Sequence, residues 1–253
     1  MHYPGGKQRH LSWLTARPIA HRGLHDKAKG ILENTHSAFA AAIKANYAIE
    51  CDLQLSADGE AMVFHDDRLD RLMQAKGPVI GQSATQLKSL SYQLGSDHMQ
   101  SLTDLLHQVQ GKVPLVIELK SHWNKNTKLA KRVVEIMRNY QGHFALMSFD
   151  PDLVQALAEL APEMPRGITA DRTTDAEYQM LALNRRLEMR YMTHIDRTRP
   201  HFISYHAAGL PFPPVRALRA AGLPVICWTI RSVQEEQKSH YFADQVTFEG
   251  YLA

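Results

Sequence analysis

Residues 47–65 read YAIECDLQLSADGEAMVFH and contain two short apolar runs separated by the turn sequence SADG. The gap is shorter than the dozen or more residues that a parallel crossover needs, so the two runs predict an antiparallel hairpin. Asp-Gly favours a two-residue type I′ turn, and that turn pairs Asp52 with His65. Because side chains alternate along a strand, this register predicts Glu50, Asp52 and His65 on one face.

Outward from the hairpin, short apolar runs recur along the chain and are followed by segments with helical periodicity. Eight strands alternating with helices in about 250 residues predict a (β/α)₈ TIM barrel, in one domain spanning residues 1–253. The hairpin distorts this barrel, and residues 66–112 form an insertion after it. An open, doubly wound sheet is the alternative, because periodicity does not show whether a sheet closes. The expected barrel strands are residues 17–21, 47–53, 114–119, 144–149, 166–170, 201–205, 224–230 and 245–249.

Helix signals between the strands support this alternation. Asp150 precedes Pro151, the pattern of an N-cap followed by proline at the first helical position. Apolar residues recur every three or four positions in residues 102–109 and 129–137, as on a helix with one buried face. The strands are therefore expected to be covered by amphipathic helices.

The composition is typical of a packed globular protein. Hydrophobic residues make up 44% of the chain and charged residues 22%, and the formal net charge is +3. Because Lys and Arg are scattered among Asp and Glu, we expect neither nucleic acid nor stable membrane association. Two cysteines cannot build a disulfide framework, and residues 1–18 hold no apolar run long enough for a signal peptide. We expect a cytoplasmic protein, and the sequence does not fix its oligomeric state.

Charged and polar residues gather where the first barrel strands and the hairpin end. In a TIM barrel the reactive groups lie at the C-terminal ends of the strands, so these residues are the candidates for chemistry. They carry three carboxylates, two imidazoles and two cations. The residues are His21, Arg22, Glu50, Asp52, His65, Glu118 and Lys120.

The carboxylates predict a metal site. Glu50 and Asp52 lie two apart on one strand and would repel each other unless a cation lies between them. Glu118, on the adjacent strand, can supply a third oxygen ligand, and an all-oxygen site suits Mg²⁺ or Ca²⁺ better than zinc. The alternative is a plain salt bridge from Glu50 to Lys120 or Arg22. The third carboxylate favours the metal.

The histidines and cations predict acid–base chemistry on an anionic substrate. His21 and His65 reach the same mouth, and imidazoles titrate near neutral pH, so the pair can act as general base and general acid. Arg22 and Lys120 flank the proposed metal and can neutralise a phosphate. The residues alone thus indicate a metal-dependent hydrolase of an anionic substrate.

An ordered set of short motifs resembles the glycerophosphodiester phosphodiesterase family in residue type, order and spacing. The resemblance runs over residues 17–230, and although each motif is weak alone, the ordered set is specific. The motifs are His21-Arg22-Gly23, Glu33-Asn34-Thr35, Glu50-x-Asp52, Asp58-Gly59, His65-Asp66, Glu118-x-Lys120, Ser148-Phe149 and Trp228-Thr229.

The resemblance implies a distorted (β/α)₈ barrel and the cleavage of small glycerophosphodiesters to sn-glycerol 3-phosphate and an alcohol, with one divalent cation. It implies that Glu50, Asp52 and Glu118 bind the metal, and that His21 and His65 are the catalytic acid and base. For His65, direct metal binding is a competing role. On the substrate side, it implies phosphate contacts from Arg22 and Lys120, an orienting role for Asn34 and a pocket wall near the glycerol from Trp228.

The chain also departs from the family pattern. Members commonly end the last strand with a run like IITD, whereas this chain has Val246-Thr247-Phe248-Glu249, so Glu249 is expected to replace the aspartate. Arg231 stands close to a position where many members carry Asn. The altered last strand motivates one alternative, a non-catalytic barrel that binds phosphodiesters. A second is a lysophospholipase D-type phosphodiesterase, with residues 66–112 forming an apolar mouth.

Overall fold

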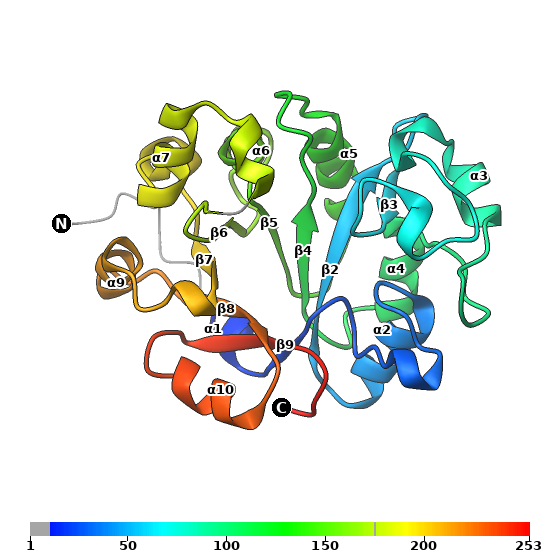
Figure 1. The fold of residues 1–253 in the computed structure, drawn as a ribbon, viewed down its shortest axis with the longest axis horizontal. Coiled ribbons are helices and arrows are strands. Elements are labelled where there is room, and N and C mark those ends of the chain that lie inside the picture. The colour runs from blue at the N-terminus through cyan, green and yellow to red at the C-terminus, as the bar shows by residue number, and fades with distance from the viewer. Residues whose placement is uncertain (1–10, 175) are drawn as a thin grey trace.

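The computed structural model describes residues 11–174 and 176–253 and shows a closed barrel of eight parallel strands ringed by helices (Figure 1). β1 pairs with both β2 and β9, which closes the ring and excludes the open sheet. All eight strands lie within or overlap the expected runs. They are β1 (Ile19–Ala20), β2 (Ala48–Leu55), β4 (Leu115–Leu119), β5 (Phe144–Ser148), β6 (Arg166–Ala170), β7 (Phe202–His206), β8 (Val225–Ile230) and β9 (Gln245–Phe248).

The helices form the outer layer. The Asp150 side chain caps the helix that begins at Pro151, as its sequence predicts. The periodic segments 102–109 and 129–137 are also helical, with their apolar stripes buried. The helices are α1 (Ser12–Thr15), α2 (His36–Lys44), α3 (Ala84–Ser89), α4 (Leu102–Val109), α5 (Lys128–Met137), α6 (Pro151–Leu160), α7 (Leu183–Tyr191), α8 (Ile195–Thr198), α9 (Pro213–Ala220) and α10 (Val233–Ser239).

The barrel interior is apolar at its floor and polar above it. Val116, Phe202 and Ile226 belong to a buried cluster that includes Leu14 of α1. The Phe202 ring fits because Gly167 faces it: a Cβ atom on Gly167 would lie 2.3 Å from the ring. The packed floor leaves the opposite, C-terminal end of the strands for the polar side chains.

The hairpin register differs from the expected one by one residue. β3 (Ala61–Val63) pairs with β2 so that Leu53 faces Val63, and Phe64 rather than His65 lies beside Asp52. The turn contains three residues instead of two. The Ser56 hydroxyl accepts a hydrogen bond from the Glu60 backbone and donates one to Asp58, which favours the longer loop.

His65 nevertheless reaches the barrel mouth, because β3 ends at Val63 and the chain turns there.

The segment after β3 folds over a small core of its own. It contains the short helices η2 (Leu69–Arg71) and η3 (Val79–Gly81) followed by α3. Its apolar side chains Leu69, Leu72, Met73 and Leu87 are buried together with Phe64. The insertion therefore does not present these residues as an apolar mouth. Among the described helices, none has the length and apolar character needed to cross a membrane.

Candidate active site

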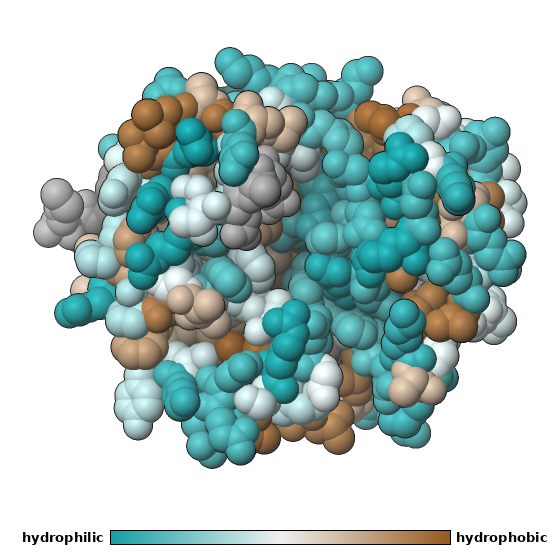
Figure 2. All heavy atoms as spheres, viewed as in Figure 1, coloured by the Kyte–Doolittle hydropathy of each residue, from teal (hydrophilic) through white to brown (hydrophobic). Residues whose placement is uncertain are grey.

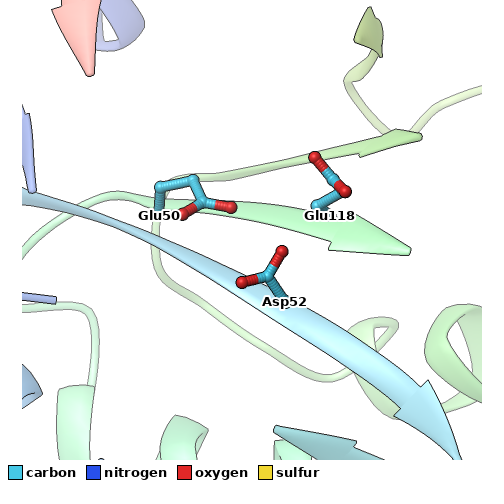
Figure 3. Close-up of side chains that lie close together, drawn as sticks. All are labelled: Glu50, Asp52 and Glu118. Carbon is cyan, nitrogen blue, oxygen red and sulfur yellow. The ribbon is translucent and has the colours of Figure 1, made fainter. Parts of the chain in front are cut away.

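Three carboxylates converge inside the mouth of the barrel (Figure 3). Glu50 and Asp52 come from β2 and Glu118 from β4, where Asp52 and Glu118 are register partners. Each offers an oxygen atom within 4.8 Å of those of the other two, and all three residues are buried. The parallel pairing of β2 with β4 thus builds the predicted cluster. His65 is not part of this set of mutually close ligand atoms.

Two cationic side chains lie beside this cluster, but they form ion pairs with only two of its three carboxylates. The Lys120 ammonium lies 2.8 Å from Asp52 Oδ1 and 2.5 Å from Glu118 Oε1. The Arg22 Nε atom lies 3.4 Å from Asp52 Oδ2. Glu50, by contrast, has no Lys or Arg side chain within ion-pair distance in the described part of the chain. The plain salt bridge expected as an alternative for Glu50 is therefore not formed.

The crowded negative charge shifts the pKa values of Glu50 and Asp52 in opposite directions. Burial, together with the charges of Asp52 and Glu118, raises the pKa of Glu50 well above its usual value. Burial acts on Asp52 in the same direction, but Lys120 and its other cationic neighbours outweigh it and hold the pKa of Asp52 below its usual value. A buried all-oxygen set with one uncompensated carboxylate fits a divalent cation of the Mg²⁺ or Ca²⁺ type.

Hydrogen bonds from the turn after β1 and from Asn34 hold two of the carboxylates in place. Arg22 has φ of 55°, and its backbone N–H donates to Glu50 Oε2 at 3.0 Å. Gly23 follows with φ of +80°, and a Cβ there would lie 2.9 Å from Ala38, so glycine is required. The Asn34 amide donates to Asp52 Oδ2 at 2.8 Å. Asn34 is 1% exposed and lies behind Asp52, outside the cavity wall.

His21 is held by the last barrel strand. Its Nδ1 lies 2.6 Å from Glu249 Oε2, and its Nε2 lies 3.9 Å from Glu50 Oε2. Arg231 contacts the other oxygen of Glu249 through Nε at 2.9 Å and an amino group at 2.7 Å. Burial lowers the pKa of His21, and the hydrogen bond to Glu249 opposes this effect. His25, which has no assigned role in the sequence, lies 3.6 Å from Glu249.

His65 is held by a chain of ion pairs that crosses the mouth. Its Nδ1 lies 2.7 Å from Asp66 Oδ1. Arg71 of η2 donates to both oxygens of Asp66, at 2.6 and 2.9 Å, and to both oxygens of Glu33, at 2.7 and 3.0 Å. Glu33 in turn accepts a hydrogen bond from Arg22 at 2.6 Å. The insertion is thereby connected to both flanks of the carboxylate cluster.

These groups open into a cavity of about 770 Å³, visible in Figure 2 as a hollow with largely hydrophilic walls. Part of the cavity wall is aromatic: the Trp228 ring packs edge-on against Phe149, with centroids 5.4 Å apart, and lies 4.9 Å from His206. Thr169, Ser204 and Thr247 also line the cavity. One part of the cavity thus suits an anion and another a small apolar or polyol group.

The structure brings eight of the nine expected site residues to the cavity wall and places the ninth, Asn34, behind it. The residues that hold the histidines were harder to predict from the sequence. Glu249 is noticeable in the sequence because it departs from the family pattern at the end of the last strand. No sequence pattern indicates a role for Arg71, because its contact with Glu33 depends on how the insertion folds. Trp123, Tyr178 and Asp171 also line the cavity, although the sequence analysis assigned them no role.

Comparisons with known proteins agree with this geometry. The sequence profile of the glycerophosphoryl diester phosphodiesterase family matches residues 21–251. YhdW of Bacillus subtilis (strain 168) is 27% identical to this chain over 87% of this chain and 88% of the relative. A glycerophosphodiester phosphodiesterase of Caldanaerobacter subterraneus subsp. tengcongensis is 28% identical over 59% of this chain and 65% of its own length.

Solved structures share the fold. A phosphodiesterase from Oleispira antarctica, in complex with the product sn-glycerol-3-phosphate, superposes with a TM-score of 0.74 at 21% identity, covering 93% of this chain and 94% of the other. A glycerophosphodiester phosphodiesterase from Thermotoga maritima gives 0.70 at 24% identity, covering 91% and 92%. With a family profile that spans all the motifs and a closed barrel that assembles them, the chain belongs to the glycerophosphoryl diester phosphodiesterase family of enzymes.

Proposed function

We propose that the protein hydrolyses glycerophosphodiesters to sn-glycerol 3-phosphate and an alcohol, in a reaction that depends on one divalent cation. The observation that carries this proposal is the buried cluster of Glu50, Asp52 and Glu118 with His21 and His65 on the same cavity. Glycerophosphocholine and glycerophosphoethanolamine are the candidate substrates. The chain acts as one catalytic unit, and we assign it to the cytoplasm, where its two buried free cysteines remain reduced.

The three carboxylates would hold the cation, and their oxygen donors favour Mg²⁺ or Ca²⁺. When bound, the cation supplies positive charge to the phosphoryl oxygens as negative charge develops on them. Lys120 and Arg22 contact the same carboxylates and lie on the cavity wall, so their free N–H groups can reach a phosphate beside the cluster. Asn34 acts indirectly, by holding the Asp52 carboxylate in place.

The two histidines share one arrangement, in which a carboxylate receives the Nδ1 side of the ring. Glu249 does so for His21 and Asp66 for His65. A proton on Nδ1 leaves Nε2 of each ring to exchange protons with the substrate. One imidazole accepts the proton of the attacking hydroxyl group, and the other donates a proton to the alcohol oxygen as its bond to phosphorus breaks.

Two observations weaken the alternative functions. Glu249 of the altered last strand contacts a candidate catalytic histidine, so the departure from the family pattern does not argue for a non-catalytic barrel. The apolar residues of the insertion are buried in its own core, so they do not form the apolar entrance on which the lysophospholipase D-type alternative depends.

The test is the release of glycerol 3-phosphate from glycerophosphocholine and glycerophosphoethanolamine by the purified protein. We expect release with Mg²⁺, Ca²⁺ or Mn²⁺ and none with EDTA. His21→Ala and His65→Ala should each lower kcat by about 10²- to 10⁴-fold, the usual contribution of general acid–base catalysis. His240→Ala, at the surface, is the matched control. Tight binding of substrate without turnover under every cation would contradict the proposal.

A further inference from the structure

A second part of the cavity wall lies two strands away from the carboxylate cluster. β4, β5 and β6 are neighbours in the barrel (Figure 1). Glu118 lies on β4, whereas Asp171 comes directly after β6 and lines the same cavity. Two strand spacings amount to about 10 Å. That separation suits a substrate whose phosphate lies at the cluster and whose short alcohol arm points toward Asp171.

Aromatic side chains surround Asp171. The Tyr178 hydroxyl, in the short helix η4 (Ala176–Met180), donates to Asp171 Oδ2 at 2.8 Å. The Trp123 ring, from the loop between β4 and α5, packs at 66° to the Tyr178 ring with centroids 6.2 Å apart. Phe149, just after β5, borders the same small void as Asp171 and Tyr178. All four residues also line the main cavity, so one carboxylate lies among three aromatic rings there.

Trp123 is the most accessible ring of this group beside Asp171, and its backbone is held in place. Asp171 and Tyr178 are 6% and 2% exposed, whereas Trp123 is only half-buried. The Trp123 backbone N–H donates to the Ser121 hydroxyl at 3.0 Å, and that hydroxyl donates to Asp150 Oδ2 at 2.5 Å. Because the loop is fixed in this way, placing the Trp123 ring against a ligand costs less conformational freedom.

The distribution of charge on the cavity wall favours a cation beside Asp171. The Lys and Arg side chains on the described wall come from the turn after β1, the insertion and the end of β4, and each is paired with a carboxylate. Asp171 supplies negative charge at a buried position, where screening by solvent is weak. The faces of aromatic rings attract cations as well, and quaternary ammonium ligands are recognised in this way.

We propose that Trp123, Phe149, Tyr178 and Asp171, hereafter the head-group subsite, bind the quaternary ammonium of a choline head group. The inference rests on the proposed function and deepens it, because it names the alcohol that is released. A trimethylammonium group donates no hydrogen bonds, so it can lie against aromatic rings without leaving a donor unsatisfied. The primary ammonium of ethanolamine brings three N–H donors to the same rings, and a neutral glycerol head group lacks the charge that the rings and Asp171 attract.

The experiment compares kcat/KM for glycerophosphocholine, glycerophosphoethanolamine and glycerophosphoglycerol at saturating cation. We expect glycerophosphocholine to be preferred by about tenfold or more. Trp123→Leu keeps an apolar side chain but removes the ring, so it should lower kcat/KM for glycerophosphocholine by about 10- to 30-fold and leave glycerophosphoglycerol nearly unaffected. Trp123→Phe should retain the preference, and Asp171→Asn should weaken it.

Tyr241→Leu is the matched control, because Tyr241 is an aromatic residue that is 79% exposed and lies outside the set that lines the cavity. It should behave like the unaltered protein, and thermal unfolding checks that each variant folds. Equal kcat/KM for the three diesters would overturn the head-group subsite while leaving the hydrolase intact. So would a folded Trp123→Leu variant that slows all three diesters alike.

A binding measurement separates failure of the subsite from failure of the proposed function. By calorimetry with the cation present, phosphocholine should bind the unaltered protein about tenfold more tightly than phosphoethanolamine, and Trp123→Leu should abolish the difference. That result without hydrolysis of any diester would support the subsite and refute the proposed function. Equal affinity for the two phosphate esters would overturn the subsite whether or not the protein is a hydrolase.

Discussion

Glu249 provides the sharpest test of how the site works, because its proposed role is to position His21 rather than to touch the substrate. Its Oε2 lies 2.6 Å from His21 Nδ1, and it is not among the residues that line the cavity. Burial would raise the pKa of Glu249, but the hydrogen bond from His21, the nearby His25 imidazole and the charge of Arg231 hold that pKa well below its usual value. The carboxylate is therefore ionised when it holds the imidazole.

Glu249→Gln removes the charge while retaining the shape. A hydrogen bond to an ionised group contributes about 1.5 to 3 kcal/mol. If that interaction maintains the reactive ring orientation and tautomer in the transition state, its loss lowers kcat by about 10- to 150-fold, since each 1.36 kcal/mol changes a rate tenfold. KM should change little, because Glu249 does not contact the cavity.

The assay is the initial rate of glycerol 3-phosphate release as a function of substrate concentration at saturating cation. Glu249→Asp should retain more activity than Glu249→Gln, because it keeps the charge. Glu236→Gln is the matched control: its carboxylate accepts a hydrogen bond from Tyr251 at 3.1 Å and does not contact either histidine candidate. An unchanged kcat for Glu249→Gln would refute the positioning role, and a rise in KM alone would indicate a substrate contact instead.

Three further perturbations test other parts of the molecule. Glu118→Gln should raise the cation concentration for half-maximal rate by at least about tenfold, measured by titration of the EDTA-treated protein with Mg²⁺. Glu33→Gln should reduce the free energy of unfolding in urea by about 2 to 3 kcal/mol at pH 7. Burial would raise the pKa of Glu33, but Arg71 and Arg22 lower it from 4.5 to about 2, so this contribution is present above pH 4.5 and disappears as the pH falls through 2. Gly59→Ala should cost about 1 to 2 kcal/mol in thermal unfolding, because φ at Gly59 is +87° while the space around it is open.

Each of these predictions has a result that would contradict it. An unchanged cation requirement in Glu118→Gln would remove Glu118 from the metal site. For Glu33, the control is Glu135→Gln, which removes an exposed ion pair to Arg132 and should have little effect. A Glu33→Gln deficit that is the same at pH 7 and pH 2 would show that the charge is not the cause. Full stability of Gly59→Ala would argue against the positive φ of Gly59 in the hairpin turn.

The barrel could be predicted from the sequence because its strands leave a local signal. Parallel strands that are buried on both faces appear as short continuous apolar runs, and the helices between them carry one buried stripe. The positions of Glu50, Asp52 and Glu118 follow directly, since neighbouring parallel strands bring their C-terminal ends together. The predicted hairpin register was wrong by one residue, because the side-chain hydrogen bonds of Ser56 favour a three-residue turn over the two-residue turn typical of Asp-Gly.

The sequence by itself thus determined the fold class, the carboxylate cluster and the pair of histidines. Strand periodicity locates the strand ends, and the barrel topology brings residues near those ends to one rim. Tertiary structure alone decided which partner holds each group. His21 meets Glu249 across 228 residues, and Arg71 meets Glu33 across 38, through contacts that exist only when the barrel closes and the insertion folds. The exposure of Leu183 and Leu187 on α7 is of the same kind: a helical repeat marks a face, but only packing decides whether that face meets the core or the solvent.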